Sequence, residues 1–247
     1  ILFDNIFLGE TFNARMLFDD WSTPEFDDSA WMPVELMKSP TDKLLEQHME
    51  PMRKVRKVEP IAVYQAEKGW ILDMGQNMTG WLQINVTEKE GTAIKMRFAE
   101  HLMPNKENID PASTGIHFTG DTQTDIYICS GKGVETWEPR FTYHGFRFVQ
   151  IEELTQKPEL QDFTGWLVRT DVAKIGTFEC SDSLINKFYN VSMWTIEDNI
   201  QGILTDCPHR ERCAWMGDNY AVAEAASYNF NLEKFWRKMA ADVETTL

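Results

Sequence analysis

The most informative part of this sequence is the stretch Thr205-Asp206-Cys207-Pro208-His209-Arg210-Glu211-Arg212-Cys213-Ala214-Trp215-Met216-Gly217-Asp218. It brings three carboxylates, two arginines and a tryptophan into fourteen residues. If the segment after Pro208 is helical, Glu211, Trp215 and Asp218 follow an i, i+4, i+7 spacing and share one helical face. A proline is tolerated in the first helical turn and pushes the chain before it out of helical geometry, so we expect Asp206 to face the same region from a loop.

These side chains suit the hydrolysis of a glycosidic bond. That reaction needs a carboxylic acid to protonate the leaving oxygen, further carboxylates to hold sugar hydroxyls, and an apolar wall for the sugar ring. The alternative interpretation is a solvated helical face with Trp215 in the core, because charge clusters usually lie at the surface and aromatic residues at helical spacing are usually buried. The charged residues of that face would be Arg210, Glu211, Arg212 and Asp218.

The stretch resembles the signature of family 78 glycoside hydrolases, the inverting bacterial α-L-rhamnosidases. The usual family form reads Asp-Cys-Pro-x-Arg-x-Glu-Arg-x-Gly-Trp-x-Gly-Asp, or is one residue shorter before the glutamate. This sequence departs from the pattern at Ala214, where the family commonly has glycine, and at Cys213 and Met216. These substitutions are small and leave every acidic position unchanged.

Further blocks are similar to the same family and follow its order. Residues 9–15 and 21–31 are similar to the end of the family's N-terminal β-sandwich. Residues 73–81 and 139–148 are similar to the β-domain that precedes its catalytic barrel. The resemblance therefore covers essentially the whole chain.

The resemblance implies a multidomain β plus α fold, in which an antiparallel β-sandwich is followed by the first helices of an (α/α)6 barrel. The implied domains are the end of an N-terminal β-sandwich domain at residues 1–45, an antiparallel β-sandwich domain at residues 54–155, and the truncated start of the barrel catalytic domain at residues 165–247.

The resemblance also implies a function, the hydrolysis of terminal α-L-rhamnosyl residues from glycosides or polysaccharides with inversion. Glu211 would be the general acid, and Asp206, Trp215 and Asp218 would contact the rhamnose. The general base of the family is a glutamate far downstream in the same barrel, and an inverting pair needs its carboxyl groups about 6.5 to 9.5 Å apart. We therefore expect these 247 residues alone to be inactive. The alternatives are a non-catalytic carbohydrate-binding module, a decayed enzyme, or a related helical-barrel glycosidase with a different sugar preference.

The composition fits a globular protein that acts on a neutral substrate. The chain is 43% hydrophobic and 12% aromatic, with a formal net charge of −15. This charge argues against nucleic acid and anionic membrane surfaces as partners, since both attract basic patches. The basic cluster at residues 53–57 is expected to be a solvated connector or strand edge. The partner we expect is a rhamnose-containing glycan or glycoside, and the sequence is compatible with a homo-oligomer.

The cysteine pattern gives no sign of a metal site, and we expect neither a metal nor a cofactor. The four cysteines form no CxxC pair, and we expect free thiols. No apolar run approaches the roughly 20 residues of a membrane helix, so no membrane insertion is expected. Any export signal is expected upstream of Ile1.

Hydrophobic periodicity separates β from α regions. Alternation typical of strands runs from about residue 54 to 154, with Gly91, Gly131 and Gly133 as turns and one long loop at residues 103–119. A short helical turn is expected at Leu44-Leu45.

Helical spacing begins after residue 170. A helix capped by Ser181 or Ser183 would carry an apolar stripe of Leu184, Ile185, Phe188, Val191 and Ile196. Further helices are predicted at residues 220–228 and from Leu232 onward.

Five other titratable residues are assigned no role. We expect Glu100 and His101 to form a loop-rim pair and His144 to be a buried, hydrogen-bonded structural histidine. His209 would either tune Glu211 electrostatically or lie exposed at a helix start. Glu224 is compatible with a solvent-facing position.

Overall fold

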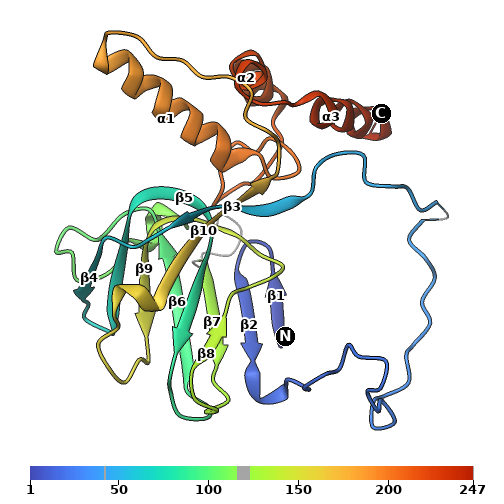
Figure 1. Cartoon of the computed structure of the whole chain (residues 1–247), viewed down its shortest axis with the longest axis vertical. Helices are drawn as coiled ribbons and strands as arrows, with labels where there is room; N and C mark the ends of the chain where they lie inside the picture. The colour runs from blue at the N-terminus through green and yellow to red at the C-terminus, as the bar shows by residue number, and fades with distance from the viewer. Residues whose placement is uncertain (42, 116–122, 247) are drawn as a thin grey trace.

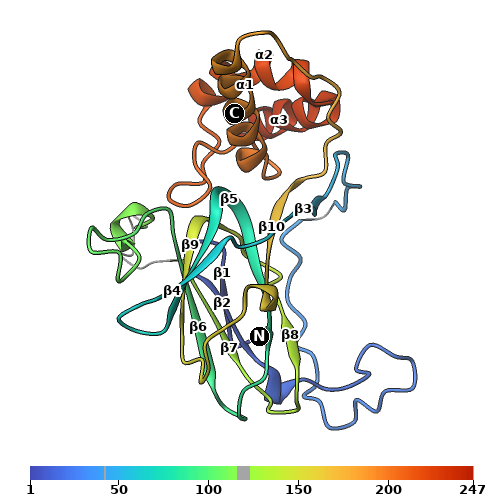
Figure 2. The same ribbon diagram turned by 60° about the vertical axis from the view of Figure 1, so that its left-hand side comes forward.

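The computed structural model describes residues 1–41, 43–115 and 123–246. It consists of a curled β-sheet body, a group of helices above one end of it, and a long extended segment that leaves and rejoins the body (Figure 1). Figure 2 shows the helices stacked over the ends of β5 and β10.

Within the described residues, the strands form one ten-stranded sheet. Its order is β1-β2-β7-β6-β9-β5-β10-β3, with β4 and β8 also paired to β5. The pairings are antiparallel except for β2 with β7, which is parallel. The strands are β1 (Phe3–Asn5), β2 (Gly9–Asn13), β3 (Met52–Val58), β4 (Ala62–Gln65), β5 (Trp70–Val86), β6 (Ala93–Ala99), β7 (Thr124–Ile128), β8 (Glu135–Trp137), β9 (His144–Glu152) and β10 (Phe163–Thr170).

The core of the sheet comes from residues that alternate along the strands. In β6, Ile94, Met96 and Phe98 are fully buried, while the residues between them are partly exposed. The side chains of Phe146 and Leu82 join the same cluster from β9 and β5. This alternation confirms the predicted strand pattern, because successive side chains of a strand point to opposite faces.

β5 is the central strand of the sheet. Its first part pairs with β4 and β9, and its second part with β10 and β8. Between Asp73 and Met78 the register with β9 shifts, and Gly75 takes a φ of 73° there. The extra residues form a bulge at the edge of the sheet body, a feature that sharpens the local twist and is frequent beside functional sites.

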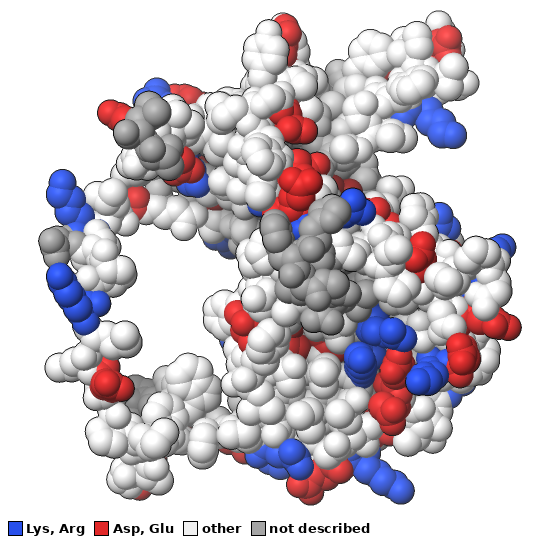
Figure 3. All heavy atoms as spheres, turned by 180° about the vertical axis from the view of Figure 1, so that it is seen from behind, with Lys and Arg blue, Asp and Glu red and all other residues white. Residues whose placement is uncertain are grey.

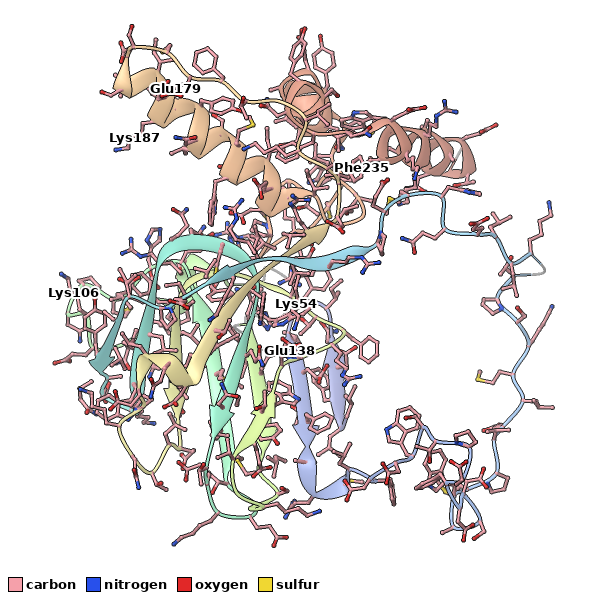
Figure 4. All side chains as sticks on the ribbon, in the orientation of Figure 1. Lys54, Lys106, Glu138, Glu179, Lys187 and Phe235 are labelled. Carbon is pink, nitrogen blue, oxygen red and sulfur yellow. The ribbon has the colours of Figure 1, made fainter. Side chains whose placement is uncertain are left out.

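The basic cluster lies on β3 at the edge of the sheet, as the sequence predicts for a strand edge. Its side chains pair with acids of other segments, and Lys54 Nζ lies 2.6 Å from Glu138 Oε1 (Figure 4). On the face drawn in Figure 3, acidic and basic side chains are interspersed.

Three α-helices lie among the described residues, namely α1 (Ser183–Asn199), α2 (Met216–Asn229) and α3 (Glu233–Thr246). Short 3-10 turns occur at η1 (Ala14–Met16), η2 (Pro111–Ser113) and η3 (Leu160–Asp162). The predicted serine cap of α1 is wrong, because Asp182 caps the helix and its carboxylate accepts from the N–H groups of Leu184 and Ile185. The helices share a second core with Phe230 and Phe235 at its centre.

The predicted apolar stripe of α1 is present, but only its C-terminal end is buried. Ile196 is 6% exposed, whereas Leu184, Phe188 and Val191 are each more than half exposed. The reason is that α1 contacts β10, β5 and α2 near its C-terminal end.

Two further sequence predictions differ from the structure or reach beyond it. The helical turn at Leu44-Leu45 is wrong, since both residues lie exposed in an extended segment where no packing offsets the cost of helix nucleation. The predicted loop 103–119 is described to residue 115, and its last residues lie outside the described part. The glycine turns are confirmed, with positive φ at Gly91 and Gly131.

Residues 165–170 belong to β10, which pairs with β5 and β3 of the sheet. None of the helices in the described part of the chain has the length and apolar character needed to cross a bilayer.

Gly80 is a position where the sheet requires glycine. Its φ is 152°, and an added Cβ would lie 1.8 Å from the backbone oxygen of Trp166 in β10. We expect Gly80→Ala to lower the free energy of unfolding by about 3 kcal/mol or more, because the strand pair must separate. Gly133→Ala is the control, since its φ is 94° but nothing lies within 4 Å of the added Cβ. Its cost should be about 1 to 2 kcal/mol from backbone strain alone. Urea unfolding of both variants checks the prediction, and equal losses would contradict it.

Candidate active site

The motif predicted as a helix is a loop between α1 and α2. Residues 207–215 are non-helical, and α2 begins at Met216. The prediction that Glu211, Trp215 and Asp218 share one helical face is therefore wrong, although Asp218 lies in the first turn of α2. Arg212 takes a φ of 52°, which a continuous right-handed helix does not allow.

Backbone and side-chain contacts close this loop at its base. Asp206 N donates to Cys213 O at 3.0 Å, and Cys213 N donates to Asp206 Oδ1 at 2.9 Å. Inside the loop, Glu211 N donates to Cys207 Sγ at 3.2 Å. Asp206 thus faces the region from a loop, as predicted, and one of its carboxylate oxygens fixes the loop.

Arg212 anchors the loop to the sheet body. Its Nε donates to Pro208 O at 2.9 Å and its Nη2 to Gln123 Oε1 at 2.9 Å, while Nη1 donates to the carbonyl of Ile6. Its guanidinium lies 4.3 Å from the ring centroid of Tyr143. Burial lowers the pKa of Arg212 to about 10, so the group remains charged at neutral pH. The alternative interpretation, in which Arg212 belongs to a solvated face, is wrong.

Gly145 of β9 provides the surface on which the loop rests. A Cβ at this position would lie 2.8 Å from Pro208 Cγ and 3.0 Å from His209 Cβ. Two of the sequence blocks that resemble the family, 139–148 and 206–218, therefore pack directly against each other.

Glu211 and Trp215 are brought together by the loop. The indole Nε1 of Trp215 donates to Glu211 Oε2 at 2.9 Å. Trp215 is 55% exposed, so the interpretation of this residue as core is also wrong. The pair presents a carboxyl group and an aromatic face to the same side of the loop.

Asp206 and Asp218 form the second pair of predicted site residues. Both line a small pocket of about 150 Å³ between α1 and α2, together with Asn199 and Thr205. Thr205 Oγ1 donates to Asn199 Oδ1 at 2.9 Å, which ties the start of the motif to the end of α1.

His209 is buried beneath the loop, which excludes the alternative of an exposed histidine at a helix start. Its Nδ1 lies 3.4 Å from Glu100 Oε1. Burial lowers the pKa of His209, and the nearby Glu100 carboxylate opposes that effect. Glu100 therefore lies next to the motif. His144 is buried, and its Nε2 lies 2.9 Å from Asp125 Oδ2, which confirms the predicted hydrogen-bonded structural histidine.

A buried polar cluster at the end of α1 positions the motif from the other side. Asp198 Oδ1 accepts from Thr79 N of β5 at 2.9 Å, and burial raises the pKa of Asp198 well above its ordinary value. Glu197 lies between Arg56 at 2.9 Å and Arg169 at 3.4 Å. The sequence analysis missed these residues. Their only signal was a charged pair at the end of an amphipathic helix.

The four cysteines are free thiols in the structure, as predicted. In the part of the chain that the structure describes, no three His, Cys, Asp or Glu side chains gather in a way that could hold a metal ion.

Three family models match the chain in sequence order. The α-L-rhamnosidase N-terminal domain matches residues 1–56, and the bacterial α-L-rhamnosidase concanavalin-like domain matches residues 64–169. The bacterial α-L-rhamnosidase 6 hairpin glycosidase domain matches residues 173–246.

The curated relatives carry the same name. An α-L-rhamnosidase of Formosa agariphila is 42% identical over 248 residues, and one of Streptomyces avermitilis is 32% identical over 238 residues. These alignments cover 100% and 95% of this chain but only 26% and 23% of the relatives. The chain thus spans about a quarter of their length.

Solved structures agree with these matches. The α-L-rhamnosidase from Dictyoglumus thermophilum gives a TM-score of 0.89 at 39% identity, covering 95% of this chain and 26% of that chain. The Streptomyces avermitilis enzyme complexed with L-rhamnose gives 0.89 at 32% identity, covering 95% and 23%. The sequence and fold are thus those of a glycoside hydrolase family. The chain belongs to family 78, the bacterial α-L-rhamnosidases, which confirms the resemblance of the motif.

Arg212→Lys should loosen the loop even though it keeps the charge. A lysine cannot reproduce the planar fork that reaches three acceptors, and each buried acceptor left without a donor costs about 1 to 3 kcal/mol. We expect a lower melting temperature and faster amide exchange in residues 206–214. Arg237→Lys is the control because the side chain of Arg237 is 77% exposed. Unchanged exchange in the Arg212 variant would show that the anchor is not needed.

His209 should make stability depend on pH. Its folded-state pKa lies below the ordinary 6.5, so the unfolded chain takes up the proton first and stability falls as the pH drops from about 6.5 toward the folded pKa. His209→Gln should reduce this loss between about pH 7 and 5, measured as the shift of the urea midpoint. Parallel curves for parent and variant would refute the assignment.

Proposed function

We propose that this chain is part of an inverting α-L-rhamnosidase that removes terminal α-L-rhamnosyl residues from glycosides or polysaccharides. The observation that carries the proposal is the contact between Glu211 and Trp215 on a loop fixed to the sheet body. The names of the relatives and the rhamnose complex of one of them support the choice of sugar.

In this proposal Glu211 is the general acid. Its protonated carboxyl donates to the glycosidic oxygen as the bond to the rhamnose carbon breaks. The carboxylate that remains accepts the indole N–H of Trp215, which holds the group in one orientation and stabilises the new charge.

The remaining predicted residues would bind the sugar. The exposed face of Trp215 offers an apolar wall for the rhamnose ring. Asp206 and Asp218 line one pocket and can accept hydrogen bonds from sugar hydroxyls. The oxygen of Asp206 that accepts from Cys213 N keeps this carboxylate aimed at the pocket.

We further propose that the general base comes from a part of the protein outside these residues. An inverting pair must leave room for a water between its carboxyl groups. The relatives are about four times as long as this chain, so most of their residues lie outside the matched part. The 247 residues alone should therefore be inactive.

The predicted domains fit this proposal. Residues 1–45 would end an N-terminal β-domain, residues 54–155 would form a sandwich, and residues 165–247 would begin the (α/α)6 barrel. Support comes from the three matched domain models and from the exposed apolar residues of α1.

Glu211→Gln in the intact enzyme should lower kcat by about 10²- to 10⁴-fold, because the amide cannot protonate the leaving oxygen. The loss should be larger for an alkyl rhamnoside than for a nitrophenyl rhamnoside, whose leaving group needs little protonation. Steady-state kinetics on both substrates measures this difference. Equal losses on the two leaving groups would exclude Glu211 as the acid.

Trp215→Phe is the matched variant. It keeps an aromatic wall but removes the N–H that bonds Glu211, so its loss of kcat should be smaller than that of Glu211→Gln.

Proton NMR of the first product gives the stereochemistry of the parent enzyme. Release of the β anomer supports inversion, and release of the α anomer would contradict it.

A further inference from the structure

A pocket of about 950 Å³ lies beside the motif loop, between β4, the bulge of β5, and the segment that follows β6. Lys106 stands at its outer rim, on the loop beside β4 (Figure 4). The volume falls in the range of pockets that hold small molecules or sugar units. Nothing in the proposed mechanism uses this pocket.

Hydrogen bonds and an ion pair hold the floor of the pocket in place. Asp73 Oδ1 accepts from Gly75 N at 2.7 Å and from Arg147 Nε at 2.8 Å, and Asp73 Oδ2 accepts from Arg147 Nη2 at 3.0 Å. The ion pair holds the β5 bulge in shape and cancels the charge of Asp73. The floor therefore offers polar groups without a strong net charge, which suits a neutral, hydroxyl-rich ligand.

The wall nearest the motif carries further hydrogen-bonding groups. Asn77 Nδ2 donates to Glu100 Oε1 at 2.8 Å, whereas Asn77 Oδ1 is buried and has no partner. His101 adds an exposed imidazole at the same wall.

The pocket lining also includes an aromatic ring. Tyr64 lies on β4, and its side chain is 43% exposed. An exposed aromatic ring above a polar floor is an arrangement that binds the apolar face of a sugar while its hydroxyls bond to side chains.

The pocket shares a wall with the motif loop. Glu100 Oε1 lies 3.4 Å from Nδ1 of His209, two residues before Glu211 in the sequence. Asn77 O also accepts from Trp194 Nε1 of α1 at 2.6 Å. A glycan held in the pocket would therefore lie next to the loop that carries the proposed acid.

We propose that this pocket is a saccharide subsite, which binds a neutral sugar unit of the substrate beyond the rhamnosyl group that is cleaved. The inference rests on the proposed function for its substrate, while the pocket itself stands on its own geometry. Tyr64 stacks on the sugar, and His101 bonds its hydroxyls.

The test compares two substrates on the intact enzyme. A nitrophenyl α-L-rhamnoside carries no further sugar unit to occupy the pocket, whereas a trisaccharide with a terminal rhamnose does. Tyr64→Ala should raise KM for the trisaccharide about tenfold, the loss expected for about 1.4 kcal/mol of stacking, and leave kcat/KM for the aryl rhamnoside within about twofold. Tyr64→Phe, which keeps the ring, should behave like the parent on both.

A second variant tests whether misfolding could cause the change in KM. His101 follows β6 and belongs to a different segment of the lining from Tyr64. His101→Ala should also raise the trisaccharide KM, with a thermal melt equal to that of the parent. If Tyr64→Ala changes both substrates by the same factor, or changes neither, the subsite does not exist.

Failure of the proposed function gives a different pattern. In that case the parent cleaves neither substrate, and titration calorimetry with the trisaccharide decides the matter. Heat that is present in the parent and lost in Tyr64→Ala supports the subsite, and equal heat or no heat in both overturns it.

Discussion

The buried guanidinium of Arg212 is the constraint on which the proposed site depends. It joins the motif loop to Gln123, to the ring of Tyr143 and to the carbonyl of Ile6, which come from separate parts of the sheet body. A charged group is costly to bury unless its donors are bonded, and here each contact also fixes the position of the loop. The conformation of Glu211 and Trp215 is therefore set by the sheet as much as by the helices that flank them.

This dependence explains why the β-domain and the helices cannot be treated as independent units. Gly145 of β9 leaves room for Pro208, and Asp198 of α1 accepts from the backbone of β5. The first contact leaves no space for a side chain at position 145, and the second is a buried hydrogen bond. Such contacts differ from the polar, easily separated interfaces of domains that move relative to each other. The rigid sheet serves as the support for a loop that carries the chemistry, the arrangement generally favoured for functional loops.

The sequence indicated that Glu211 and Trp215 lie near each other, but it predicted the wrong backbone conformation for them. The spacing of Glu211 and Trp215 correctly indicated contact, yet for the wrong reason, because the contact is made by a loop and not by a helix. The positive φ of Arg212 follows from partners up to 206 residues away, and no local pattern carries that information. The strands were predictable because their alternation is local, as in β6. The cap of α1 at Asp182 lay within one residue of the prediction, while the buried Asp198 could not be foreseen without knowing where the helix docks.

The parallel pairing of β2 with β7 has a consequence for how the molecule is made. Residues 11–13 pair with residues 126–128. The carbonyl of Ile6 accepts from the side chain of Arg212, which lies 206 positions later in the sequence. At a synthesis rate of about 5 to 20 residues per second, the N-terminal hairpin leaves the ribosome on the order of ten seconds or more before Arg212 exists. Until β7 has been made, β2 has no partner on that side, so this pairing depends on slow, non-local closure. The contacts of Arg212 that fix the motif loop therefore form only after the distant parts of the sheet body that they join have been made.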